Sequence, residues 1–290
     1  EPDKAEIAAK KAAPSKPDDK DDKSWGIGAD IAFDLGIGAF ISDKYTRRVR
    51  SRFTFGINEY YTIPVIDVDV HADTGFSQWL SKSGGENGKY EFRWADSNLG
   101  FSRDIWDYSS GDFSVTFNAD LTFVIPTSRA SINAKLYTTI VPTLSASLTF
   151  DRLSLAYSIS YGYSAHKYTS VTLDPADVDV LSRSTGNEIL NSHNIAIGGV
   201  LGEHELANQF VIGIACIKKV LNLSIGLAFD DSWTYDNGTI TRDDELVGRH
   251  AKSGRGHSQY SQGSIVLAYT PIRYATISLG MVSTQPWKTA

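Results

Sequence analysis

Residues 25–41 read WGIGADIAFDLGIGAFI, with an apolar side chain at every odd position and mostly glycine, alanine or aspartate at the even positions. Successive side chains of a β-strand point to opposite faces, so this stretch predicts one long strand with an apolar face and a small or acidic face. The same pattern recurs at 113–125, 153–163 and 221–229. Several of these runs exceed the roughly 5–6 residues usual in soluble strands and match the roughly 9–11 residues with which a tilted strand crosses a bilayer.

A soluble β-sandwich also alternates, and the chemistry of the polar positions distinguishes the two folds. A soluble sheet turns Lys and Glu toward water, whereas the polar positions here are mainly Ser, Thr, Asn, Gly and Ala. Residues 112–165 hold 6 charged side chains in 54 residues, where the chain-wide 21% predicts about 11. An apolar belt with Tyr and Trp toward the strand ends is what lipid contact selects. The pattern therefore predicts an all-β fold, a transmembrane up-and-down antiparallel β-barrel.

Composition bears on the function classes. The net charge is −6 without a basic stripe, which argues against a nucleic-acid partner. A single cysteine, Cys216, excludes an internal disulfide framework and a cluster of thiolate metal ligands. No run of about eighteen apolar residues is present, so the sequence predicts no transmembrane helix.

The lengths of the connections determine how the strands are assigned. Tight turns are expected at 151–152, 218–220 and 271–273, and long connections at 168–207 and 236–258. Bacterial barrels have short periplasmic turns and longer outer loops, so the tight turns are assigned to the periplasm and 193–201 is placed within an outer loop. The further outer loops are expected at 42–47, 74–87 and 126–134.

Eleven strands result, at approximately 25–41, 48–61, 65–73, 88–101, 112–125, 135–149, 153–167, 208–217, 221–235, 259–270 and 274–284. Because bacterial barrels have an even number of strands, we expect about 12. Either the last strand is missing from the sequence or the count is off by one. The barrel is assigned to 24–290.

The first 23 residues have a different composition. They carry 7 acidic and 6 basic side chains and no aromatic residue. Such a segment buries too little apolar surface to offset its ordering entropy, so 1–23 is predicted to be a disordered, charged periplasmic tail.

Charged side chains on the first two strands are the candidate site. The apolar positions of 48–61 take the lipid face, so Arg48, Arg50 and Arg52 point inward, as do Asp30 and Asp34 on the first strand. Opposite charges on neighbouring strands can form a ladder of ion pairs. The ladder is either a pore constriction that selects ions or a structural network that keeps a narrow lumen closed.

Enzymatic and metal-site signatures are weak. No H-E-x-x-H or G-x-S-x-G spacing occurs, and neither catalytic residues nor a cofactor is predicted. His250 and His257 lie near Asp243, Asp244 and Glu245 in the connection 236–258. Histidines in a solvated loop are more often unliganded, so no metal site is predicted.

The chain resembles porin-like outer-membrane β-barrels of Gram-negative bacteria over about 25–284. The resemblance rests on the alternating strands, on Val124-Ile125-Pro126-Thr127 as a Pro-Thr strand exit, and on LGMVSTQPWKT at 279–289. It implies an integral outer-membrane location and a barrel fold, and some barrels of this general kind serve envelope assemblies, including motility complexes, as anchors rather than channels. The family usually ends in an aromatic residue, whereas this sequence ends in Thr289-Ala290.

The sequence is compatible with two functions. The first is a passive channel for ions or small hydrophilic solutes, with the lipid bilayer as its partner. The second is a structural barrel that anchors a cell-envelope assembly, such as a motility or secretion complex, through 1–23, 168–207 or 236–258. The sequence specifies no oligomeric state.

Overall fold

The computed structural model describes residues 24–36, 50–79, 92–128, 131–132, 134–167, 170–172, 196–236, 255–272 and 275–286. Within these ranges the fold is all-β and consists almost entirely of one twelve-stranded antiparallel sheet. Helical backbone is confined to 131–132 in the described part. None of the described segments is a helix of sufficient length and apolarity to cross a membrane.

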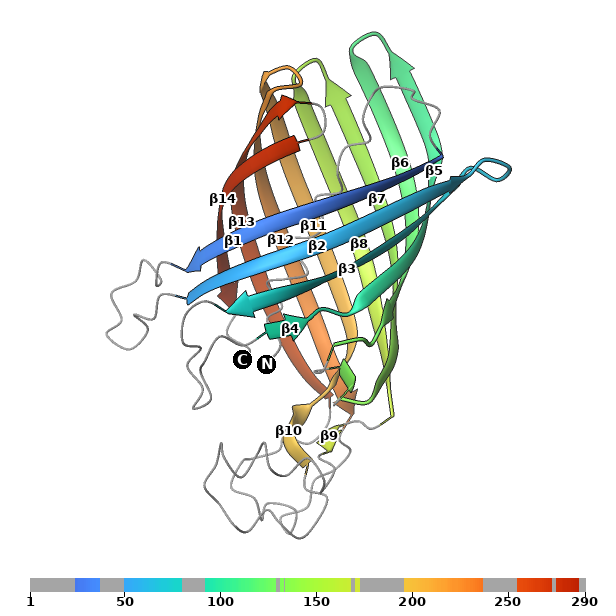
Figure 1. Cartoon of the computed structure of the whole chain (residues 1–290). Coiled ribbons are helices and arrows are strands. Elements are labelled where there is room, and N and C mark those ends of the chain that lie inside the picture. The colour runs from blue at the N-terminus through green and yellow to red at the C-terminus, as the bar shows by residue number, and fades with distance from the viewer. Residues whose placement is uncertain are drawn as a thin grey trace.

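The strands follow one another around the sheet in chain order (Figure 1). They are β1 (Trp25–Gly36), β2 (Arg50–Ile63), β3 (Val68–Trp79), β5 (Ser97–Ser110), β6 (Phe113–Ile125), β7 (Leu136–Phe150), β8 (Leu153–His166), β11 (Gly202–Ile217), β12 (Leu221–Asp236), β13 (Arg255–Ile272) and β14 (Ala275–Pro286). The short β4 (Phe92–Trp94) pairs with residues 76–78 of β3, and β5 pairs with residues 69–73 of the same strand. A separate two-stranded sheet joins β9 (Ser170–Thr172) to β10 (Ala196–Val200).

The eleven predicted strands are confirmed as the eleven strands of this path, and the described part of 193–201, strand β10 (Ala196–Val200), is confirmed to lie outside the main sheet. Several boundaries were wrong. The fourth strand is 97–110 instead of 88–101, and the third extends to Trp79. The long connections are shorter than predicted, because 202–207 belongs to β11 and 255–258 belongs to β13.

These errors have a common physical cause. Charged residues such as Arg103, Asp104 and Glu205 interrupt the apolar alternation, so the stretches that hold them read as connections. In the structure the strands continue through these charged residues. β5 also contains a register shift between Asp104 and Trp106, and such a bulge breaks the period of two.

Short turns gather at one end of the sheet and long connections at the other (Figure 1). Four of the short turns each contain one residue with positive φ: Asp67 (49°), Gly111 (60°), Asp151 (50°) and Lys219 (65°). Tight hairpins require this left-handed backbone because its twist matches that of the strands, and glycine and aspartate adopt it readily. We refer to the two ends as the tight-turn end and the long-connection end.

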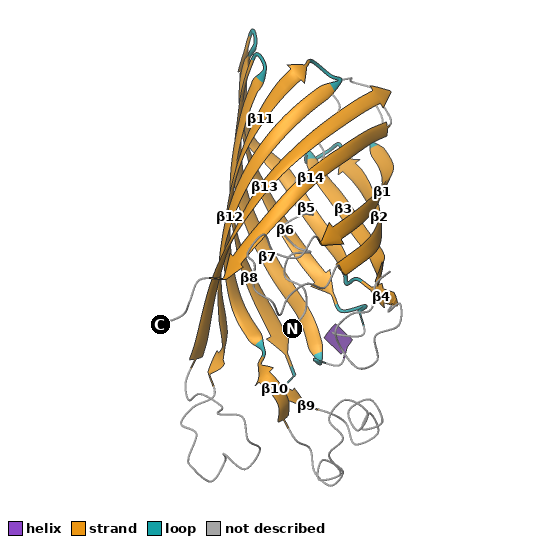
Figure 2. Ribbon diagram, turned by 90° about the vertical axis from the view of Figure 1, so that its left-hand side faces the viewer, coloured by secondary structure: helices purple, strands orange, loops and turns teal. Residues whose placement is uncertain are grey.

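The two faces of the sheet have opposite chemistry, and the polar side chains take the sheltered face. On β12, exposed apolar residues alternate with buried small or polar residues in the order Ile225, Gly226, Leu227, Ala228, Phe229 and Asp230. Across the described residues, Ala228 is the only buried hydrophobic side chain, and the buried polar ones are Ser77, Ser128, Ser160, Asp230, Ser232 and Gln262. Because the sheet is curled (Figure 2), its sheltered side is concave; we call this the inner face and the convex side the outer face.

The two borders of the sheet are β1 and β14. In the described residues β1 pairs with β2 alone and β14 with β13 alone, so the strands form an open, curled sheet. Closure into a barrel and insertion into a membrane therefore stay predictions. The tail 1–23 lies outside the described residues.

Candidate functional site: an acidic inner face

Glycines on the inner face let long polar side chains lie flat across neighbouring strands. A Cβ built on Gly28 of β1 would lie 2.2 Å from Asn58 Oδ1, and one built on Gly100 of β5 would lie 2.1 Å from His71 Nε2. Real Cβ atoms do not approach other atoms so closely, so these positions favour glycine. Gly26 and Gly28 of the quoted stretch thus serve the packing of the inner face.

The imidazole of His71 on β3 crosses Gly100 and reaches β6. Its Nε2 lies 3.4 Å from Asp120 Oδ2, and both side chains are less than one-third exposed. Thr122 donates a hydrogen bond of 2.8 Å to the other oxygen of Asp120. The carboxylate of Asp120 is therefore held in one orientation on the inner face.

Three further carboxylates on the same wall are held by neighbouring polar side chains. Thr62 donates to Asp69 across the β2–β3 pair, and Asn98 donates to Asp73 at 2.8 Å. On β1, Asp30 accepts a hydrogen bond of 3.3 Å from Asn58. Each of these three donors is a neutral side chain.

The wall formed by β11 to β13 carries the one buried carboxylate of the described residues. Asp230 on β12 is 6% exposed, lies opposite Tyr260 in the register and hydrogen-bonds with it. Gln262, also 6% exposed, lies on the inner face of β13. Close by, the hydroxyls of Ser232 and Ser258 are 2.6 Å apart. This wall therefore offers oxygen atoms to the concave side.

The charged side chains that the register places on the inner face are mostly acidic. Among the residues whose side chains the structure describes, the acids are Asp30, Asp69, Asp73, Asp104, Asp107, Asp120, Glu205 and Asp230, and the bases are Arg52 and Arg93. Fixed negative charges lining a concave surface raise the local concentration of cations. No three His, Cys, Asp or Glu side chains come together to hold a metal ion in the described part of the chain.

Four of the residues predicted as the site, Asp30, Asp34, Arg50 and Arg52, belong to the paired strands β1 and β2. Asp34 is directly opposite Arg52, and Gly36 is opposite Arg50 at the beginning of β2. Asp30 lies on the inner face, opposite Gly56 of β2. Arg48 lies outside the described residues. The ladder of ion pairs stays a prediction, and the middle of the inner face is acidic rather than basic.

Sequence reasoning missed the acids of β3, although their signal is plain. Asp69, His71 and Asp73 alternate with Val68, Val70 and Ala72. This is the pattern that identified the first strand, with charged residues in place of glycines. Asp120 carries the same signal as a single acid between Ala119 and Leu121.

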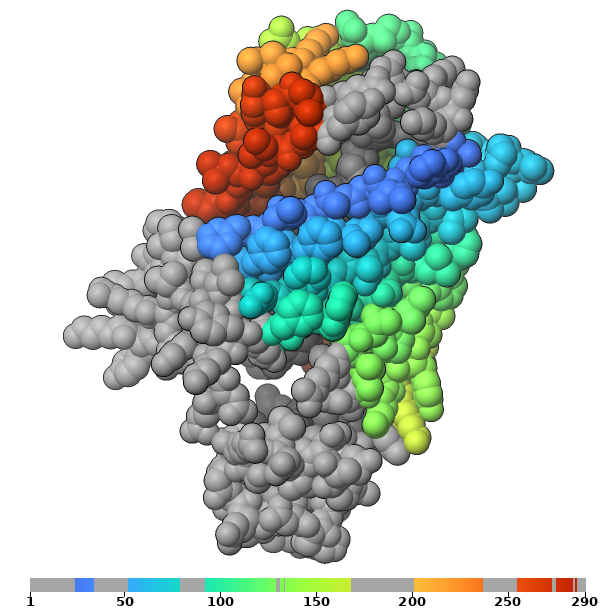
Figure 3. Space-filling model, in the orientation of Figure 1, coloured from blue at the N-terminus to red at the C-terminus, as the bar shows by residue number. Residues whose placement is uncertain are grey.

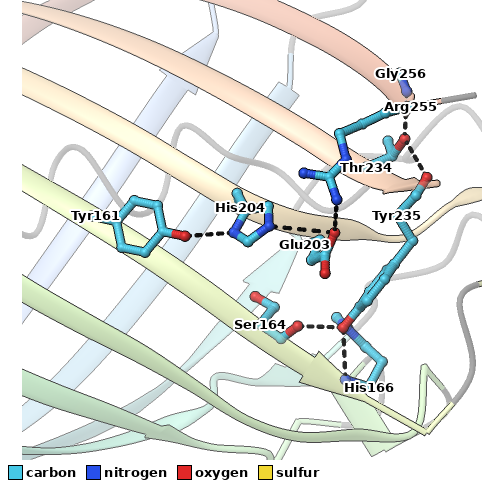
Figure 4. A network of polar contacts seen from close by, with 9 residues as sticks. All are labelled: Tyr161, Ser164, His166, Glu203, His204, Thr234, Tyr235, Arg255 and Gly256. Carbon is cyan, nitrogen blue, oxygen red and sulfur yellow. Dashed lines mark hydrogen bonds and ion pairs between the residues drawn. The ribbon is translucent and has the colours of Figure 1, made fainter.

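A network of polar contacts joins four strands at the long-connection end (Figure 4). The Tyr235 hydroxyl donates to the Ser164 carbonyl at 2.5 Å and accepts from the His166 backbone N–H at 3.1 Å, connecting β12 to β8. Arg255 donates to Glu203 at 2.7 Å, connecting β13 to β11. The network fixes the strand ends from which the connections 167–201 and 237–254 depart.

His204 extends this network on the outer face. Its Nδ1 lies 2.6 Å from the Tyr161 hydroxyl and its Nε2 lies 3.4 Å from Glu203 (Figure 4). Nearby, His257 stacks on Trp233 with ring centroids 5.1 Å apart and its Nε2 lies 3.1 Å from Asp231. His257 is thus a strand residue of β13 instead of a loop residue, and the other members of its predicted cluster lie outside the described residues.

An ion pair connects two turns at the tight-turn end. Lys218 Nζ lies 2.6 Å from Asp151 Oδ1, and both side chains are about half exposed. The hydrogen bond from Lys218 lowers the pKa of the Asp151 carboxyl below its ordinary value, and the same bond raises the pKa of Lys218. The pair is a solvated contact between the β7–β8 and β11–β12 turns.

Comparison with known proteins adds no family assignment. No family model matches the chain, and no curated protein matches it either.

Proposed function

We propose that the sheet is the wall of a transmembrane β-barrel of about 12 strands in a bacterial outer membrane, with the tight turns in the periplasm. The barrel is a passive, water-filled pathway that prefers cations and small hydrophilic solutes of positive charge.

The observation that carries this proposal is the inverted distribution of side chains. Apolar residues such as Leu144, 57% exposed, and Leu279, 77% exposed, lie outward, whereas the buried side chains are nearly all polar. In water this arrangement forfeits the burial of apolar surface that drives folding. Against lipid the same arrangement is favourable, because the apolar belt contacts acyl chains and the polar face contacts water.

Aromatic side chains support the same orientation. Toward the tight-turn end the outer face carries Trp25, Trp106 and Tyr108, and toward the long-connection end it carries Tyr163 and Trp233. Between them lie aliphatic residues such as Leu144. Transmembrane barrels have two aromatic girdles that flank an apolar band in this way.

The preference for cations follows from the inner face. Carboxylates at 69, 73, 104 and 120 extend across neighbouring strands of one wall, and Glu205 and Asp230 lie on the other. Rings of Asp and Glu side chains select cations in channels. The prediction that arginines select the solute therefore applies at most to the end of the wall that carries Arg52 and Arg93.

Single-channel recording in a planar bilayer tests the proposal. The full chain should give discrete current steps, and a salt gradient should give a reversal potential of the sign expected for cations. Silence from a protein that inserts in folded form, or a preference for anions, would overturn the proposed pathway.

An anchoring barrel is the second candidate, and the network of Figure 4 favours it. The contacts of Tyr235 and Arg255 fix the roots of two long connections, as a scaffold that presents loops to a partner would require. Replacing Arg255 by Met should then release a bound envelope partner while leaving the current unchanged. A current that falls together with partner binding would argue against a separate anchoring role.

A further inference from the structure

A buried amide on the inner face has an acceptor without a partner. Gln262 on β13 is 6% exposed, and its side-chain oxygen Oε1 makes no hydrogen bond with any of the described residues. Its cross-strand neighbour on β12 is Ala228, whose methyl group offers no donor. A buried acceptor that makes no hydrogen bond is costly and uncommon in folded proteins. The oxygen of Gln262 is therefore available to a donor that the chain does not supply.

Two carboxylates lie close to this amide. Asp230 on β12 lies opposite Tyr260 and accepts a hydrogen bond from it, so Asp230 is the diagonal neighbour of Gln262. Glu205 on β11 lies opposite Ser232, so it is the diagonal neighbour of Asp230 on the other side, and it is near enough to Tyr260 to interact with it electrostatically. The backbones of diagonal neighbours are about 7–8 Å apart, which long side chains can span.

The inner face of this wall is acidic, and the neighbours of Asp230 are small. Its cross-strand neighbour on β11 is Ala207, and Ala228 and Ser232 flank it on the same face of β12. Among the inner-face positions that the structure describes on β11, β12 and β13, none is lysine or arginine. Arg255, at the beginning of β13, donates to Glu203. The wall thus combines negative charge with a neutral acceptor.

The position of the wall shelters these groups. The strands β11 to β13 lie across the concave interior from β1 to β3 in both ribbon views (Figures 1 and 2). In the space-filling view β1 and β2, in blue, cover the wall (Figure 3). Electrostatic attraction is stronger where water is partly excluded, so a cation in this interior gains more from a carboxylate than it does in bulk water.

The donor set distinguishes an ammonium group from a metal ion. Calcium takes about 6–8 oxygen ligands, several of them carboxylates. In the described part of the chain no three His, Cys, Asp or Glu side chains come together to hold a metal. A primary ammonium group has three N–H donors and needs only three acceptors, and charge strengthens each hydrogen bond to a carboxylate. Asp230, Glu205 and Gln262 offer these three acceptors.

We propose that Asp230, Glu205 and Gln262 bind the primary ammonium group of a small solute on the inner face. One N–H group donates to Gln262 Oε1, and the two carboxylates accept the others and supply the opposite charge. The inference rests on the proposed pathway for the access of the solute to this wall. It goes beyond a general preference for cations, because the site requires N–H donors as well as positive charge.

Two isomeric cations test the requirement for N–H donors. Butylammonium and tetramethylammonium have the same composition and charge, and only the first has N–H groups. The full chain, folded in lipid vesicles, is unfolded with denaturant at increasing concentrations of either chloride salt and constant ionic strength. A ligand that binds only the folded state raises the unfolding midpoint by mass action, which gives the Kd. We expect a Kd for butylammonium at least about tenfold below that for tetramethylammonium, because charge-assisted hydrogen bonds are gained.

Substitutions locate the site on this wall. Gln262→Met removes the neutral acceptor and Asp230→Asn removes a charge, and each should raise the Kd for butylammonium at least about tenfold. The matched controls are Gln259→Met and Asp231→Asn on the outer face, which should leave the Kd unchanged. If Asp230→Asn fails to fold, Glu205→Gln tests the role of charge with the same expected direction.

The outcomes separate this site from the proposed pathway. Equal Kd values for the two isomers, or a Kd unchanged by both Gln262→Met and Asp230→Asn, would overturn the ammonium site. So would calcium chloride alone, if it raised the unfolding midpoint more than butylammonium at equal concentration and displaced it, because the groups would then hold a metal. The measurement needs no current. A protein that is silent in a bilayer but binds butylammonium as expected would retain the site and lose the pathway.

The converse result is equally distinct. A conducting, cation-selective protein that binds both isomers equally would retain the pathway and lose the site.

Discussion

The outer and inner faces of this sheet differ in the reverse of the usual sense. On the outer face Leu144 pairs with Ile159, and both are exposed. One residue along, on the inner face, Ser145 pairs with Ser158. Each strand therefore carries an apolar and a polar face whose positions alternate residue by residue. The predictions below exploit neighbouring positions that differ only in the face they occupy.

The largest expected effect comes from a charge on the outer face. Leu144→Arg at the middle of β7 should lower the free energy of unfolding by about 2–4 kcal/mol, because the guanidinium would enter the bilayer midplane. Chemical denaturation in lipid vesicles measures this loss. Ser145→Arg, at the same depth on the inner face, is the matched control and should lose far less. Equal losses of unfolding free energy at the two positions would contradict the assignment of Leu144 to an apolar face and Ser145 to a polar face.

Glycine substitutions test the difference in packing. Gly75→Ala on the inner face would place a Cβ 2.5 Å from the Phe55 carbonyl oxygen, and backbone cannot move aside as a side chain can. We expect a loss of about 1–3 kcal/mol in unfolding free energy, as for overpacking. Gly263, on the outer face, has no atom within 4 Å of its ideal Cβ. Gly263→Ala should therefore leave stability unchanged or raise it, and a larger loss there would contradict the face assignment.

Charge neutralisation tests which face meets the permeating ions. Asp120→Asn keeps the shape of a side chain fixed by Thr122 and His71 but removes its charge. Because two unit charges 4 Å apart interact by about 1 kcal/mol in water, the cation-to-anion permeability ratio should fall by up to about fivefold. Reversal potentials in a salt gradient measure the ratio. Asp231→Asn on the outer face should leave it unchanged, and an equal change in both variants would disconnect selectivity from the inner face.

The smallest effect is expected at the tight turns, outside both faces. Lys218→Met should raise the pKa of Asp151 toward its ordinary value, because the hydrogen bond that lowers it is lost. A carboxyl whose pKa is lowered by folding contributes stability above its unfolded pKa, and that contribution disappears as the pH falls through the folded value. For so exposed a pair the stability change should be small. Carboxyl NMR titration measures the shift; Lys219→Met is the control and should produce none.

Much of this architecture was predictable because a period of two is a strong signal wherever one face is apolar. The alternation at 25–41 and 153–163 located strands that the structure contains. The tight turn at Asp151-Arg152 and the long connection predicted at 168–207 identified opposite ends of the sheet. The position of 196–200 outside the main sheet followed from the parity of the connections alone.

The ends of the strands and the acids of the inner face were less accessible. Near the long-connection end the strands pass beyond the apolar belt, so Glu203 or Arg255 reads as loop although the backbone ladder continues. The contact of His71 with Asp120 requires Gly100 between them, because the imidazole crosses β5 to reach β6. It therefore depends on the register of three strands. Such a contact depends on pairings between segments far apart in sequence, which a local pattern does not specify.

Cysteine accessibility along one strand tests the central claim most directly. Single cysteines at Thr143, Leu144, Ser145 and Ala146 of β7, in a Cys216→Ser background, would be exposed to a water-soluble maleimide in proteoliposomes. If the inner face meets water and the outer face meets lipid, positions 143 and 145 react quickly and positions 144 and 146 are protected. Uniform reactivity at all four positions, or protection of 143 and 145 instead, would contradict a sheet with its apolar face in a membrane.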